Sequence, residues 1–174
     1  MTINAEDSAR TADTTHYAPE EPARMAWHSL APEVYKAMFQ LELASRKDLD
    51  PVLVELVKTR ASQINQCAYC LDMHTKDALA AGETTERLLQ LSAWRESRHF
   101  YTEKELAALE LTEAVTVLTD GFVPDEVYAR AAEQFEETEL VKLIAVITTI
   151  NAWNRFGVAT RAVPGHYKPG MFKH

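Results

Sequence analysis

The sequence predicts an all-helical protein folded as one domain, and three observations indicate this. Only five of the 174 residues are glycine, and Ala, Leu and Glu, which favour helix over sheet, are frequent. Apolar residues recur with the spacing of a helix along most of the chain, and no clean strand alternation is visible. The length suits one domain with a substantial core, because 47% of the residues are hydrophobic and 25% are charged.

The N-terminal residues are expected to lie outside this core. Residues 1–23 are mostly polar and acidic and include two prolines, a composition typical of a flexible arm. Tyr17 and Trp27 offer anchors with which the arm could contact a neighbouring subunit. Residues 24–174 are then predicted to form a single helical domain.

Helix signals begin directly after the arm. Pro32 suits the first position of a helix, and apolar residues follow it along one side. Asp50 can cap a second helix, which is expected to end near residue 64. After a short break the next helix is expected to begin near Cys67 and to end at Gly82, a residue suited to a left-handed C-terminal position.

Two more helices are expected in the middle of the chain. Thr84 or Thr85 can cap a short helix that continues to about residue 94. Thr102 and Glu105 have the spacing of a capping box and open a helix that is expected to reach about residue 120.

The last long helix is the most apolar part of the sequence. Pro124 opens a helix before it, and Thr138 is expected to cap the long helix itself, which runs to about residue 161. Its apolar stretch 140–150 is too short to span a bilayer and contains Lys142, so no membrane span is predicted. Such a helix is expected to be buried or to contact another subunit.

The charge excludes several classes of partner. The formal net charge is −8, from 26 acidic and 18 basic side chains. This balance disfavours nonspecific nucleic-acid binding and docking on anionic lipid. The first residues do not resemble a secretory signal, so we expect a cytoplasmic protein. In that reducing compartment a close cysteine pair is more often redox-active or metal-binding than structural.

The two cysteines of the chain form the motif Cys67-Ala68-Tyr69-Cys70, and His74 follows four residues later. On a helix, positions i, i+3 and i+7 share one face, so both sulfurs and the imidazole are expected to lie along one stripe. The expected helix N-terminus favours the thiolate, which is the nucleophile toward peroxides and disulfides. His74 is placed to exchange a proton with it.

Glu55 is expected to join this group from the preceding helix. The short break at residues 65–66 predicts an antiparallel helical hairpin. Glu55 lies roughly 13 Å back along the first helix and His74 roughly 10 Å along the second, at 1.5 Å per residue. The two side chains are therefore at similar depth, where a buried carboxylate can orient an imidazole.

The residues alone leave other interpretations open. Cys67, Cys70 and His74 could belong to a metal-binding or redox-sensing module, with Glu55 or Asp72 as a fourth ligand. The cysteines could also be small core residues. A thioredoxin-like oxidoreductase is disfavoured, because that motif follows a strand and none is visible.

The combined pattern resembles a known family. Glu55, the cysteine pair and His74 read E-x11-C-x2-C-x3-H, which closely resembles the signature of the alkylhydroperoxidase D family, within the carboxymuconolactone decarboxylase superfamily. The resemblance is strongest over residues 50–95. Residues 150–158 also resemble the closing helix of a shorter branch of that family.

The resemblance implies a fold, an activity and a role for each residue. It implies a helical bundle that assembles as a homo-oligomer, a trimer or hexamer, and acts as a thiol-dependent peroxidase in antioxidant defence. Cys70 would attack the hydroperoxide, Cys67 would be the resolving and more accessible thiol, and His74 and Glu55 would relay protons. No bound cofactor is expected, because an external dithiol or redox protein would supply the electrons.

Tyr69 is the main departure from that pattern. Well-studied members carry a histidine between the cysteines, and a tyrosine, which titrates near ~10, relays protons less readily at neutral pH. Its hydroxyl can still donate a hydrogen bond. A slower peroxidase or a diverged member without that activity is the alternative, whereas decarboxylase members generally lack the cysteine pair.

Overall fold

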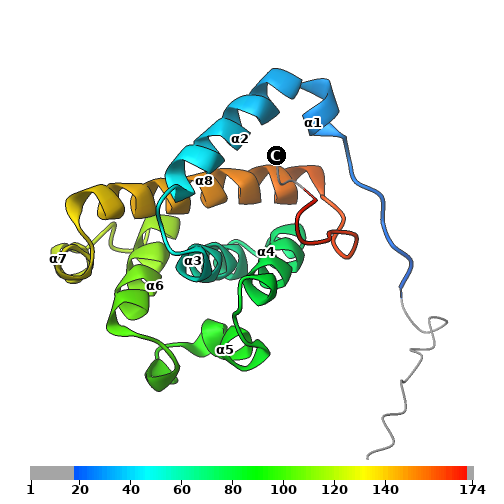
Figure 1. Cartoon of the computed structure of the whole chain (residues 1–174). Helices are drawn as coiled ribbons and strands as arrows, with labels where there is room; N and C mark the ends of the chain where they lie inside the picture. Colours follow the sequence, from blue (N-terminus) through cyan, green and yellow to red (C-terminus); the bar gives the residue numbers. More distant parts are fainter. Residues whose placement is uncertain (1–17, 172–174) are drawn as a thin grey trace, which may run out of the picture.

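The computed structural model describes residues 18–171, and every regular element in this range is a helix, which confirms the all-α class (Figure 1). The elements are α1 (Trp27–Leu30), α2 (Pro32–Arg46), α3 (Pro51–Ile64), α4 (Ala68–Ala80), α5 (Thr85–Gln90), the 3₁₀ turns η2 (Leu91–Ala93) and η3 (Arg98–Phe100), α6 (Glu103–Thr116), α7 (Asp125–Gln134) and α8 (Glu137–Thr160).

Several helix starts follow from the capping residues that the sequence indicated. The Asp50 carboxylate accepts hydrogen bonds from the first free N–H groups of α3, at 2.7 and 3.2 Å. Thr84 caps α5, and Thr102 forms the predicted capping box with Glu105 at the start of α6. Gly82 has a φ of +104°, which matches its expected left-handed conformation after α4.

Other boundaries differ from the prediction. The cap of α8 is Glu136, which forms a capping box with Glu139, so Thr138 lies inside the helix rather than at its cap. α6 ends at Thr116 rather than near residue 120, and α5 gives way to a 3₁₀ turn after Gln90. The start of α8 is thus set by a local capping box at Glu136, which lies two residues before the predicted cap.

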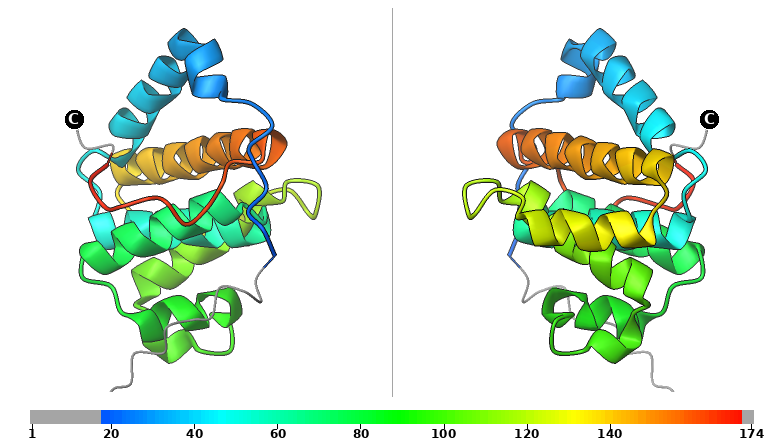
Figure 2. Two further views of the ribbon diagram at one scale, coloured as in Figure 1. Left: turned by 90° about the vertical axis from the view of Figure 1, so that its right-hand side faces the viewer. Right: turned by 90° about the vertical axis from the view of Figure 1, so that its left-hand side faces the viewer.

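α3 lies at the centre of the bundle and packs against α4, α6 and α8 (Figures 1 and 2). Most of its residues are buried, including charged ones. One core cluster joins α3 to α6, α7 and α8, and includes Leu53, Val57, Leu111, Val146 and Ile147. A second cluster under α5 includes Leu56, Leu91, Trp94 and Leu109.

The α1–α2 pair stands above this core (Figure 2). α2 packs against α8, and α1 follows directly from the N-terminal segment. The sequence did not predict α1, a single turn. Residues of α1, α2, α4 and the end of α8 line a common cavity.

The predicted N-terminal arm is described only in part. Residues 1–17 lie outside the described residues, so the division at residue 23 stays a prediction. Residues 18–26 are not helical, and the Arg24 N–H donates to the Thr160 carbonyl at 2.8 Å. Glu21 forms an ion pair with Arg161, and Glu20 forms one with His166 at 2.8 Å. Among residues 18–171, no helix combines the length and apolar character that crossing a bilayer requires.

Candidate functional site

The cysteine motif lies at the N-terminus of α4, as the sequence predicted. Cys67 is the N-terminal cap residue, and its Sγ accepts a hydrogen bond from the Cys70 N–H at 3.4 Å. The turn before it requires a left-handed residue, Gln66, with a φ of 53°. Cys67 thus directly precedes α4, and Cys70 lies in the first turn of α4, where the helix N-terminus favours a thiolate.

Cys67 and Cys70 form a disulfide, with their Cα atoms 5.3 Å apart. Both residues are buried, with only 1% and 2% of their surfaces exposed. Contrary to the expectation, Cys67 is therefore not the more exposed of the two residues. Gly157 of α8 packs against both sulfurs, because an added Cβ would lie 2.8 Å from the Cys67 Sγ and 3.5 Å from the Cys70 Sγ.

Asparagine side chains of α8 hold the turn in place. The Asn65 amide donates to the side-chain oxygens of Asn151 and Asn154, at 2.9 Å each, and the Asn154 amide donates to Ser62 at 3.0 Å. Sequence reasoning missed this network. Its signal was the pair of asparagines at i, i+3 within an otherwise apolar helix, which require buried partners.

Glu55 and His74 meet across the α3–α4 hairpin, as their similar depth predicted. Their Oε2 and Nδ1 atoms are 2.8 Å apart, and both residues are buried. Because an ionised carboxylate only accepts hydrogen bonds, the Nδ1 of His74 carries the hydrogen, and Nε2 is left for other partners. Burial raises the pKa of Glu55, but the charge and hydrogen bond of His74, together with Lys58 and Arg46, outweigh it and hold this pKa below its usual value.

Two buried residues extend this pair on the α3 side. Lys58 is 1% exposed, forms an ion pair with Glu42 of α2, and lies 3.9 Å from Glu55. The two carboxylates give this buried ammonium the partners that a charge removed from water requires. Sequence reasoning missed Lys58, although a lysine among the apolar residues of a central helix was the available signal.

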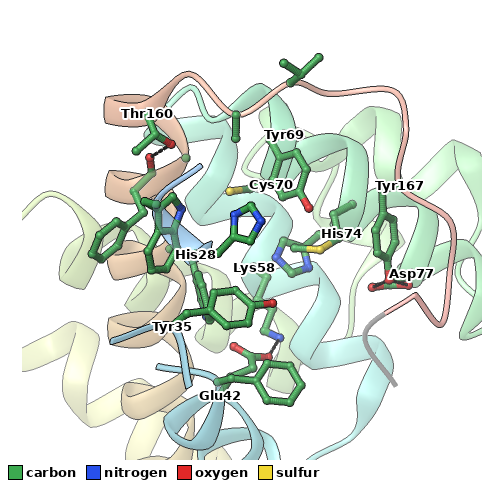
Figure 3. A pocket seen from close by; sticks show the side chains of 18 of the residues that line it. His28, Tyr35, Glu42, Lys58, Tyr69, Cys70, His74, Asp77, Thr160 and Tyr167 are labelled. Atoms are coloured by element: carbon green, nitrogen blue, oxygen red, sulfur yellow. Dashed lines mark hydrogen bonds and ion pairs between the residues drawn. The ribbon is translucent and has the colours of Figure 1, made fainter. Parts of the chain in front are cut away.

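Asp77 extends it on the α4 side. Asp77 lies one turn after His74, and both of its oxygens are 2.8 Å from the Tyr167 hydroxyl. Burial is the main cause that raises the pKa of Asp77, and the charge of Glu55 adds to it. Tyr167 comes from the segment after α8, so the C-terminal part of the chain closes this side of the site (Figure 3).

A cavity of about 580 Å³ brings these groups together. Cys70, His74, Glu55, Lys58 and Asp77 line it, whereas Cys67 does not. Figure 3 shows the labelled side chains gathered around this space.

The opposite wall of the cavity is aromatic. Trp27 of α1 stacks on Phe156 of α8 with ring centroids 4.0 Å apart, and Tyr35 of α2 meets Trp153 at 5.6 Å. Tyr69 also lines the cavity, and burial raises the pKa of its hydroxyl. The site therefore joins an apolar, aromatic wall to a polar wall that carries one cysteine sulfur, an arrangement typical of a small-molecule site.

The metal-binding alternative finds a different set of residues. Glu55, His74 and Asp77 hold ligand atoms within 4.8 Å of one another and could hold a metal ion. The set proposed from the sequence is not assembled, because both cysteines are joined in the disulfide and Asp72 is turned to Lys76, at 2.7 Å. Two of these three residues also have other partners among residues 18–171: Lys58 lies beside Glu55, and the Tyr167 hydroxyl donates a hydrogen bond to Asp77.

Comparisons with known proteins agree with the resemblance. Residues 32–114 match the model of the carboxymuconolactone decarboxylase family. YdfG, an uncharacterised protein of Bacillus subtilis (strain 168), is 42% identical over 137 residues, which cover 78% of this chain and 92% of the relative. YnjA, an uncharacterised protein of Escherichia coli (strain K12), is 35% identical over 114 residues, which cover 66% of this chain and 62% of the relative.

A solved structure is similar over most of the fold. A protein of unknown function from Agrobacterium tumefaciens, for which a role as the antioxidant defence protein AhpD has been suggested, matches with a TM-score of 0.80 and 35% identity. The match covers 84% of this chain and 100% of the other.

Proposed function

The chain belongs to the carboxymuconolactone decarboxylase family, and we propose that it is a thiol-dependent peroxidase that reduces organic hydroperoxides with Cys67 and Cys70. The observation that carries this proposal is the cysteine pair at a helix N-terminus beside the buried Glu55–His74 pair. The antioxidant role suggested for the Agrobacterium protein also supports it.

The first step takes place at Cys70, which lines the cavity. Its thiolate attacks the distal oxygen of the hydroperoxide, and the O–O bond breaks. Cys70 becomes a sulfenic acid, and the leaving alkoxide takes up a proton and departs as an alcohol. Cys70 lies in the first turn of α4, where the positive end of the helix dipole favours the attacking thiolate.

His74 supplies the proton, and Glu55 orients the His74 imidazole. The hydrogen bond from Nδ1 to Glu55 fixes the ring and leaves Nε2 as the nitrogen that exchanges protons in the cavity. His74 and, to a smaller extent, Lys58 hold the pKa of the Glu55 carboxyl below its usual value although it is buried. A positioned acid–base group of this kind contributes about 10²–10⁴-fold to a rate.

The second step forms the disulfide. The Cys67 thiol attacks the sulfenic sulfur of Cys70, a new S–S bond forms, and water leaves. Two electrons have then passed from the cysteine pair to the hydroperoxide. An external dithiol or redox protein returns them by thiol–disulfide exchange.

The size and lining of the cavity favour organic hydroperoxides over hydrogen peroxide. A space of about 580 Å³ with an aromatic wall can bury an apolar substituent, whereas hydrogen peroxide would leave that wall without a partner. Tyr69 is placed on the same cavity, where its hydroxyl can donate a hydrogen bond to an oxygen of the substrate.

The deciding experiment follows hydroperoxide consumption. Wild-type protein, Cys70→Ser and Cys67→Ser are mixed with cumene hydroperoxide and a dithiol reductant. We expect Cys70→Ser to lose the activity. When the reductant is left out, Cys67→Ser should consume about one equivalent and then stop, because its sulfenic acid meets no thiol that could resolve it. Equal rates for wild type and Cys70→Ser would refute the proposal.

A further inference from the structure

We propose that the reducing thiol attacks Cys70, from the side of the cavity, and that Cys67 is the sulfur released. This inference rests on the proposed function only in that the disulfide must be reduced for a second turnover. It reverses the roles expected from the sequence, in which Cys67 exchanges with the reductant.

Access to the two sulfurs carries the proposal. Cys70 lines the cavity of about 580 Å³, and Cys67 does not. Gly157 also lines the cavity and packs against both sulfurs, because an added Cβ would lie 2.8 Å from the Cys67 Sγ and 3.5 Å from the Cys70 Sγ. The backbone of α8 is therefore closer to Cys67, the sulfur that does not line the cavity. A thiolate must approach the sulfur that it attacks along the S–S axis, and from the cavity only Cys70 offers that approach.

Stabilisation of the released thiolate supports the same assignment. The Cys67 Sγ is the N-terminal cap of α4 and accepts the Cys70 N–H at 3.4 Å. A thiolate released there keeps this hydrogen bond and the favourable end of the helix dipole. Thiol–disulfide exchange is faster when the released thiolate is stabilised, so the released sulfur is the one at the cap.

The exchange balances with a dithiol as the electron donor. Its first thiolate forms an S–S bond with Cys70, the Cys67–Cys70 bond breaks, and Cys67 leaves as the thiolate. The second thiol of the donor then attacks its own sulfur in the mixed disulfide and releases Cys70. The donor is oxidised to a disulfide, both cysteines are reduced, and the two protons lost by the donor thiols balance the two that Cys67 and Cys70 take up.

The geometry also limits the kind of donor. Because the disulfide is buried and is approached through a cavity walled by α1, α2 and α8, the reacting thiol must be carried on a slender group. Hydroperoxide and reductant then use the same space in turn, at the same sulfur.

A mapping experiment tests which cysteine is attacked. Oxidised wild-type protein is treated briefly with 2-mercaptoethanol, quenched with acid, and its free thiols are alkylated. No hydroperoxide is present, so the outcome does not depend on whether the protein is a peroxidase. Trypsin cleaves after Arg60 and Lys76 and leaves both cysteines on one peptide, whose fragment ions between residues 67 and 70 locate the adduct.

We expect the mercaptoethanol adduct on Cys70 and the alkyl group on Cys67, in an excess on the order of tenfold. Adducts shared equally, or found mainly on Cys67, would overturn the proposal.

Single-cysteine variants give an independent measurement. Cys67→Ser leaves Cys70, Cys70→Ser leaves Cys67, and each is reacted with 5,5′-dithiobis(2-nitrobenzoate) in native buffer and in denaturant. We expect Cys70 to react on the order of tenfold faster in the native protein and the two rates to become similar on unfolding. Similar native rates, with both proteins folded by circular dichroism, would contradict the assignment.

Discussion

Glu55 and Asp77 flank His74, and their pKa values move in opposite directions. The pKa of Glu55 lies below the ordinary 4.5, because its cationic neighbours outweigh burial. Its contribution to stability is therefore present above 4.5 and is lost as pH falls through the lower folded value. The pKa of Asp77 is raised from 3.8, chiefly by burial, so its contribution is present at lower pH and is lost as pH rises through the folded value.

This contrast gives a prediction for Glu55→Gln, with Asp77→Asn as the matched control. We expect Glu55→Gln to lower the free energy of unfolding by about 1–3 kcal/mol at pH 7, because a charged buried hydrogen bond is lost. The difference from wild type should shrink as the pH falls below 4.5. Denaturant unfolding at several pH values measures both variants.

For Asp77→Asn the trend should be opposite: relative to wild type, the variant gains stability as the pH rises. The same trend for both variants would mean that the environments of the two carboxyl groups are not those described.

Gly157 matters at the residue scale because it leaves room for a sulfur rather than because of its backbone. It lies within α8, where alanine would normally stabilise a helix by about 1 kcal/mol. An added Cβ would lie 2.8 Å from the Cys67 Sγ, so something must shift. We predict that Gly157→Ala instead destabilises the oxidised protein by about 1–3 kcal/mol, the usual cost of overpacking.

The exposed Ala159→Gly variant, on the same helix, provides the control for helix propensity. It should cost about 1 kcal/mol in the oxidised and the reduced protein alike. If Gly157→Ala stabilised the oxidised protein, the close approach of α8 to Cys67 would be disproved.

At the scale of elements, the sequence was most informative where local chemistry sets the structure. Asp50 and Thr102 marked the starts of α3 and α6 because each side chain satisfies free N–H groups within its own first turn. The meeting of Glu55 with His74 followed from helix rise and a short turn alone. These features need no knowledge of the rest of the chain.

The features that the sequence did not predict depend on contacts between distant elements. The burial of Cys67 under α8 and the ion pair between Lys58 and Glu42 join residues that no local pattern connects. The cavity itself exists because α1 and α2 stand off from α4, an arrangement that only tertiary packing fixes. Unequal access to the two thiols could not have been foreseen for this reason.

The short helix α1 contributes Trp27 to the aromatic wall, and this suggests a test of substrate preference. Trp27→Ala removes the ring stacked on Phe156 at 4.0 Å. We predict that KM for cumene hydroperoxide rises about tenfold, in keeping with the loss of roughly 1–2 kcal/mol of apolar contact, while the rate with hydrogen peroxide hardly changes. Leu89→Ala, at an exposed position on α5 away from the cavity, should leave both unchanged. Equal losses with both peroxides would show that the wall does not select the substrate.

At the scale of the whole molecule, the outer face of α1 and α2 exposes several large apolar side chains. Leu30 is 73% exposed, and Val34 and Leu41, which lie two turns apart on one face of α2, are 40% and 48% exposed. The inner face of α2 carries Tyr35 and Glu42 of the site. We predict that the outer face is covered by another copy of the chain, because contiguous exposed apolar surface marks interaction sites.

Light scattering at micromolar concentration tests this assembly. We expect wild-type protein to form a homo-oligomer, a trimer or hexamer, and Leu41→Lys to dissociate it, because the lysine would be buried without a partner. Leu89→Lys, at a more exposed site on α5 at the other end of the molecule, should remain assembled (Figure 1). Because α2 carries site residues on its inner face, loss of assembly should also raise KM for cumene hydroperoxide. A monomeric wild type would contradict the prediction, and so would a Leu41→Lys variant that stays assembled.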